Sequence, residues 1–152
     1  MLRTTALALC VGLFSLFPLA FATESGDIHI TNSWARASAP GAPSAGFMLV
    51  TNNGDTDDTL LSVSGDFAKR LELHSTIQVD GVMKMIHQQN GVVIPAHGSV
   101  LFKPGSYHMM FMGLSKNFVE GERYTVILTF AKAGDIEVEL PVQAMMMESM
   151  SH

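Results

Sequence analysis

Histidine and methionine residues gather between positions 74 and 110 of this 152-residue chain, a segment that holds four of its six histidines and four of its eleven methionines. Ten residues separate His74 from Met85 and twenty-two separate Met85 from His108, with Met110 two positions further on. Imidazole and thioether groups bind metals at neutral pH without losing a proton, and together they favour Cu(I). These four residues are therefore predicted to form a metal site with two nitrogen and two sulfur ligands.

Two neighbouring residues, Met83 and His87, are secondary candidates for the same site. Each residue also has a purely structural explanation, because a methionine in a β protein commonly fills the core, as we expect for Met48. We expect His29 to be exposed and His97 to lie in a turn. On composition alone, metal binding and a methionine-rich core are equally good explanations.

The part of the chain that must position these ligands shows no sustained helical periodicity. Short apolar runs alternate with turn sequences, which is typical of an all-β sandwich or barrel. Many short strands without a helix predict Greek-key connections between two packed sheets. The predicted strands lie near residues 28–36, 47–51, 60–63, 71–79, 82–87, 92–94, 100–102, 107–112, 124–130 and 136–142.

The dipeptide Asp80-Gly81 is the strongest hairpin signal in the chain. If these two residues form the turn, strand alternation places four side chains on one face of the hairpin, with Met85 diagonal to His74: His74, Met83, Met85 and His87. On a later strand, His108 and Met110 are two positions apart and therefore also share a face. The hairpin and the later strand together are predicted to supply the whole ligand set.

The first 22 residues have the pattern of a secretory signal peptide. Arg3 precedes an apolar run over residues 6–19, and Ala20-Phe21-Ala22 matches a cleavage site. The run is short for a membrane span and is interrupted by glycine, serine and proline. We therefore predict cleavage after Ala22, a folded domain over residues 23–142, and a C-terminal tail over residues 143–152.

The single cysteine, Cys10, lies inside the predicted signal, and Leu9 stands where a lipoprotein would need a small residue. The mature chain then has no thiol, which excludes disulfides, thiolate catalysis, cysteine-ligated metals and blue-copper electron transfer. No Ser–His–Asp or paired-carboxylate motif is visible. The sequence therefore predicts a binding protein and not an enzyme.

Charge excludes a further class of partner. Without Arg3, the nine basic residues become eight against fourteen acidic ones, a formal charge of −6. Nucleic acids and anionic membrane surfaces call for clustered basic residues, which this chain lacks. We expect an exported, soluble monomer without a membrane span.

With these residues in place, the sequence resembles the periplasmic copper chaperones of the CuA-assembly type (PCuAC-like), which carry a His–Met–His-x-Met motif. The motif falls on His74, Met85, His108 and Met110, and the likeness extends over residues 27–142. Here the Met–His spacing is one residue longer than the family commonly shows, so Met83 remains an alternative to Met85. Further similar stretches are Trp34-Ala35-Arg36, TNNGDTDD, KRLELH, GVMKM, IPAHG and KPGSYHMMFMGL.

The resemblance implies a cupredoxin-like β-sandwich that holds Cu(I) near its surface. It also implies transfer of copper in the periplasm to an oxidase subunit or to a Sco-type assembly protein. Two other functions remain open: copper buffering or resistance without a dedicated acceptor, and a non-metal interaction module. A sandwich of the last kind would bind no copper.

The C-terminal tail concentrates soft ligands a second time. A second copper ion bound there, a cover over the first site, and no role at all are all compatible with its composition. The residues concerned are Met145, Met146, Met147, Met150 and His152.

Overall fold

The structure, a computed structural model, describes residues 23–144, and every regular element within that range is a β-strand. The chain order is β1 (Thr23–Ser25), β2 (Ile28–Arg36), β3 (Ser44–Asn52), β4 (Asp58–Ser64), β5 (Ala68–Val79), β6 (Val82–His87), β7 (Val92–Ile94), β8 (Gly98–Phe102), β9 (Tyr107–Leu114), β10 (Arg123–Phe130) and β11 (Gly134–Gln143). No helix in residues 23–144 is long and apolar enough to cross a membrane.

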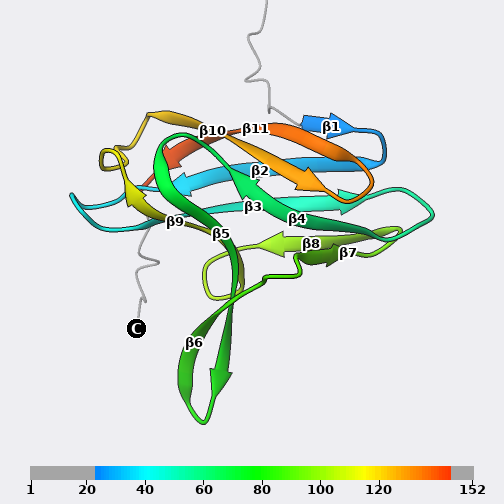
Figure 1. Cartoon of the computed structure of the whole chain (residues 1–152), viewed down its shortest axis with the longest axis horizontal. Helices are drawn as coiled ribbons and strands as arrows, with labels where there is room; N and C mark the ends of the chain where they lie inside the picture. The colour runs from blue at the N-terminus through cyan, green and yellow to red at the C-terminus, as the bar shows by residue number, and fades with distance from the viewer. Residues whose placement is uncertain (1–22, 145–152) are drawn as a thin grey trace, which may run out of the picture.

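The strands form the predicted sandwich (Figure 1). The hydrogen-bonded order is β6-β5-β9-β8-β3-β2-β11-β10-β4-β7, with β1 added beside β2 and a further pairing between β9 and β3. β11 joins the two layers, because it pairs in parallel with β2 and antiparallel with β10. Neighbours in the sheet are often distant in the sequence, as Greek-key connections require. The predicted all-β class and strand positions are confirmed.

Alternation along the strands builds the core between the layers. In β10 the side chains of Val126, Leu128 and Phe130 are buried, while their sequence neighbours face outward. An aromatic cluster fills one end of the core, where the Phe118 and Tyr124 rings stack with centroids 4.0 Å apart. Burying each such side chain contributes about 1.5–3 kcal/mol relative to exposure. This core fixes β9 and the body of β5 in place.

The hairpin formed by β5 and β6 extends beyond the sandwich. Beyond Ser75, which is the last residue of β5 to pair with β9, β5 pairs only with β6. We call residues 76–86 the arm, and Figure 1 shows it projecting from the sandwich. Its turn is Asp80-Gly81, with φ angles of 51° and 77° that match a tight two-residue hairpin turn. All six residues of β6 are exposed. The predicted register, with His74 opposite His87, is confirmed.

Some expectations need correction or fall outside the described residues. β1, which pairs with β2 through a turn at Gly26, was not predicted, because three polar residues carry no strand pattern. His29 is half-buried and not exposed, since it lies within β2 between β1 and β3. The predicted signal peptide and the tail ligands lie in residues 1–22 and 145–152, outside the described range.

Candidate metal centre

Three adjacent strands place three histidines in one row. His74 on β5 lies opposite His87 on β6 and, on its other side, opposite His108 on β9. Residues directly opposite one another on neighbouring strands point to the same face of the sheet. The His74 ring stacks on the His87 ring at a centroid distance of 5.4 Å, and it lies 5.8 Å from the His108 ring. The pairing of β5 with β9 thus joins segments that are far apart in the sequence.

The two predicted methionine ligands lie on the same face. Met110 follows His108 by two positions, and Met85 lies diagonally from His74 because its direct partner is Thr76. Met85, His108 and Met110 line one surface pocket of about 90 Å³. His74 adjoins this pocket through its ring contact with His108. The structure therefore brings together all four residues of the predicted set.

Hydrogen bonds fix which ring nitrogens are free. The Nε2–H of His74 donates to the Glu72 carboxylate at 2.8 Å, and the Nδ1–H of His108 donates to the Ser106 carbonyl at 3.0 Å. Nδ1 of His74 and Nε2 of His108 are buried and have no hydrogen-bond partner. A buried polar atom without a partner costs about 1–3 kcal/mol. A metal-binding histidine characteristically donates its other N–H to a carboxylate or carbonyl, which is the arrangement found at both rings.

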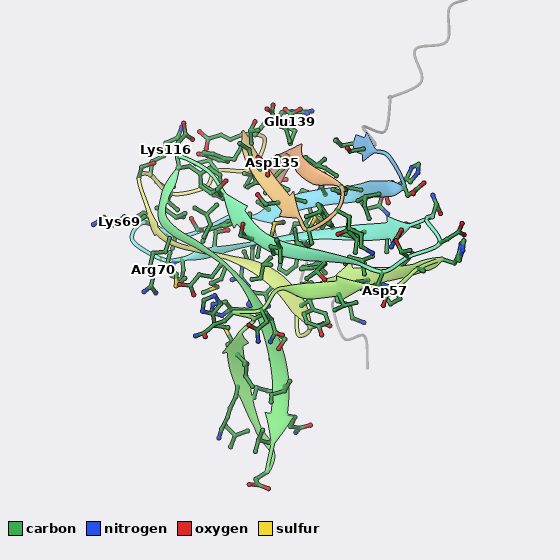
Figure 2. The ribbon with its side chains drawn as sticks, turned by 45° about the vertical axis from the view of Figure 1, so that its right-hand side comes forward. Asp57, Lys69, Arg70, Lys116, Asp135 and Glu139 are labelled. Carbon is green, nitrogen blue, oxygen red and sulfur yellow. The ribbon has the colours of Figure 1, made fainter. Side chains whose placement is uncertain are left out.

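The charge states of His108 and Glu72 favour binding of a cation. Burial lowers the pKa of His108, so that its imidazole is neutral at neutral pH. The hydrogen bond from His74 lowers the pKa of Glu72, and the charges of His87 and Arg70 lower it further. Arg70 Nε and His87 Nδ1 lie 3.6 and 3.8 Å from the Glu72 carboxylate. Glu72 is thus an ionised carboxylate that joins two of the three histidines, and Figure 2 shows Arg70 on the sandwich above the arm.

The other histidines and methionines have different surroundings. Met48 and Met109 are buried in the core, as predicted for Met48. Met112 lies beside Arg70, with its sulfur 3.1 Å from a guanidinium nitrogen. His97 lies in a turn and pairs with an aspartate at 2.8 Å. None of these residues joins the row of three histidines.

Sequence reasoning missed three residues of the site. Glu72 and Ser106 each precede a histidine by two positions, a spacing that on a strand signals a shared face. Arg36 lines the pocket from β2, and no local sequence pattern indicates that it lies near the histidines. Within residues 23–144, no group of three or more His, Cys, Asp or Glu side chains is arranged to hold a metal ion. The methionine sulfurs beside the imidazoles are soft ligands, and a mixed neutral set of this kind favours Cu(I).

Most of the chain matches a known protein family. The family described as "LpqE-like: Putative lipoprotein LpqE-like" matches residues 28–142. A relative from Leifsonia xyli subsp. xyli (strain CTCB07), named "Putative lipoprotein Lxx21020", is 28% identical over 120 residues, which cover 79% of this chain and 72% of the relative.

Among solved structures, the copper-bound PCuAC domain from PmoF2 superimposes with a TM-score of 0.68 at 24% identity, covering 82% of this chain and 98% of that domain. The Cu(I) form of DR1885 from Deinococcus radiodurans superimposes with a TM-score of 0.56 at 26% identity, covering 75% of this chain and 78% of that protein. The expected cupredoxin-like fold and the resemblance to PCuAC domains are confirmed.

Proposed function

We propose that this chain, which belongs to the LpqE-like family, binds Cu(I) and delivers it to another copper protein. The proposed ligands are His74, Met85, His108 and Met110. The observation that carries the proposal is the pair of buried imidazole nitrogens without hydrogen-bond partners, each on a ring oriented through its other nitrogen. The likeness to the Cu(I) form of DR1885 supports the choice of metal.

Two properties of the site suit transfer and not storage in a closed cage. His74 and His108 are largely buried, whereas Met85 is 61% exposed. A partner can therefore displace the exposed thioether first, while the two imidazoles still hold the ion. Such stepwise ligand exchange needs no catalytic group, so the protein acts as a carrier. Met83 lies two positions nearer the tip of the arm and is the less suitable ligand for the pocket.

The arm supports delivery to a protein acceptor. It carries five of the ten exposed large apolar side chains within residues 23–144. Ile77, Val82 and Ile86 share the face directed away from the metal ligands. Exposed apolar patches mark protein contact sites, and this one lies on the same hairpin as Met85, on its other face. We propose that a copper acceptor, either the oxidase subunit that holds CuA or a Sco-type assembly protein, contacts the arm.

The proposed cellular setting is the periplasm. The signal peptide would direct export of the chain and would be cleaved after Ala22. The family is named after lipoproteins, but Cys10 does not match a lipid-attachment site. Leu9 stands directly before it, where such a site needs a small residue. The folded domain would act as a monomer, and the methionines and histidine of the tail would bind a second copper ion. Gln143, where β11 ends, pairs with Arg36, which lines the metal pocket.

The test is anaerobic Cu(I) transfer from the loaded protein to a purified apo CuA domain, measured as the copper content of each protein after separation and as the CuA absorption that appears when ferricyanide removes one electron from the dicopper(I) centre. We expect transfer to the CuA domain or to a purified Sco-type protein. An Ile77→Ser, Ile86→Ser variant should load normally and transfer more slowly, whereas a Val93→Ser control, which changes an exposed valine on β7, should behave as wild type. Tight loading without transfer to either acceptor would instead favour copper buffering.

A further inference from the structure

β6 presents soft metal ligands at every second position. Met83, Met85 and His87 alternate with Val82, Lys84 and Ile86, so the first three share one face of the strand. Both methionines are more exposed than any other large apolar side chain in residues 23–144, at 58% and 61%, and His87 is 42% exposed. Within residues 23–144, no methionine outside the arm lies among the exposed large apolar side chains.

The two faces of the arm differ in chemistry. The face opposite the ligands is aliphatic, with Ile77, Val82 and Ile86, and only Lys84 is charged there. The ligand face pairs Met83 with Gln78 and Met85 with Thr76. Apolar contact alone would be served equally well by branched aliphatic residues, which have higher strand propensity than methionine. The choice of thioethers on one face only therefore points to metal chemistry.

We propose that Met83, Met85 and His87 form a further Cu(I) site, the capture site, which is distinct from the proposed tail site, receives copper and passes it to the main site. This inference rests on the proposed function. Same-face residues on a strand are about 6.6–6.8 Å apart at their Cα atoms. Three flexible torsions let each methionine bring its sulfur toward its neighbour. One sulfur, that of Met85, belongs to both sites.

Because both sites share Met85, the ion keeps one ligand throughout the transfer. Copper held by the capture site gives up Met83 and His87 and gains His74, His108 and Met110, while Met85 stays bound. The ion remains Cu(I) throughout, so no electron or proton has to move. His87 already stacks on His74 at 5.4 Å, which places its ring beside the imidazole that receives the ion.

The direction of transfer follows from how well each site is organised. Hydrogen bonds to Glu72 and Ser106 hold the main-site imidazoles, and both rings are largely buried. The capture site lies on a fully exposed strand, so its side chains lose more rotamer freedom when they bind. The capture site is therefore weaker and more accessible, and copper moves inward from it.

The experiment follows the methionine ε-methyl NMR signals of the full chain during anaerobic Cu(I) addition. In a His108→Ala, Met110→Leu variant, which lacks the main site, substoichiometric Cu(I) should shift the Met83 and Met85 signals. Adding Met83→Leu and His87→Gln should weaken that residual binding at least tenfold. Adding Met112→Leu, a thioether on the same sheet face outside both sites, should not change it.

A rate measurement gives an independent readout. In an otherwise wild-type chain, Met83→Leu should slow Cu(I) loading several-fold and leave the main-site affinity within about threefold. Loading at the wild-type rate, or a Met83 signal that copper leaves unmoved while only tail signals shift, would overturn the capture site even if the main site binds tightly. Absence of Cu(I) binding in the wild type would instead overturn the proposed function, and the capture site with it.

Discussion

Glu72 provides the sharpest prediction, because it is not a proposed ligand yet should control the affinity for Cu(I). Its carboxylate accepts the Nε2–H of His74 at 2.8 Å, which leaves Nδ1 of His74 as the buried ring nitrogen without a hydrogen-bond partner. Replacement of Glu72 by alanine frees the ring to rotate and to change tautomer. The metal-facing nitrogen is then correctly placed only part of the time.

Loss of such an orienting partner typically costs 10–100-fold in metal affinity, or about 1.4–2.7 kcal/mol. We expect a loss in this range for Glu72→Ala. Glu72→Gln keeps an amide oxygen that can accept the same proton, so its loss should be below tenfold. Metal-free stability should change by less than about 1 kcal/mol in both variants, since partly exposed ion pairs contribute little.

The assay is anaerobic competition for Cu(I) against a chromophoric chelator, combined with ¹⁵N NMR of the His74 ring to read its tautomer. The matched control is Glu139→Ala, which removes a carboxylate that pairs with Arg123 at 3.2 Å and lies on the side of the sandwich away from the arm (Figure 2). Affinity of Glu72→Ala within twofold of wild type, with the same His74 tautomer, would refute the reasoning.

The remaining predictions concern stability and stoichiometry. Asp58 is buried and accepts three backbone N–H groups, so Asp58→Ala should lower the free energy of unfolding by roughly 2–4 kcal/mol in urea titrations; a change below 1 kcal/mol would contradict this. Gly91→Ala should cost roughly 1–3 kcal/mol in thermal unfolding, because φ is +81° and the added Cβ would meet the Leu60 carbonyl oxygen; an unchanged melting temperature would argue against it. Burial lowers the pKa of His108, so the unfolded chain takes up this proton first and metal-free stability should fall as the pH drops below about 6.5; His108→Gln should flatten that part of the curve, and an identical curve would exclude this cause. Truncation after Gln143 should lower the number of copper ions bound per chain by one, as measured by native mass spectrometry. An unchanged copper-to-protein ratio would eliminate the tail site.

Local sequence signals were sufficient for the arm. Asp80-Gly81 defines a two-residue turn, and such a turn leaves one register for the strands that follow and precede it. The pairing of His74 with His87 and the shared face of Met83 and Met85 follow from that register and from strand alternation. These features are set by contacts between residues close together in the chain.

The non-local features could not be obtained in this way. The row of histidines depends on the pairing of β5 with β9, and no turn connects these strands directly. Register between distant strands is set by the core that both strands help to build, where Leu73 and Met109 lie opposite each other. The resemblance to a known motif suggested that His74 and His108 meet. Arg36, supplied by a third distant strand, had no such signal.

The measurement that tests the central claim most directly is an anaerobic Cu(I) competition titration of the wild type beside a His108→Ala, Met110→Leu variant. His108 is 5% exposed and Met110 lines the same pocket, so their loss removes the organised half of the site. The account predicts tight binding of Cu(I) by the wild type and a collapse of that binding, by at least a hundredfold, in the variant. Equal affinity in both proteins, or no binding in either, would contradict it.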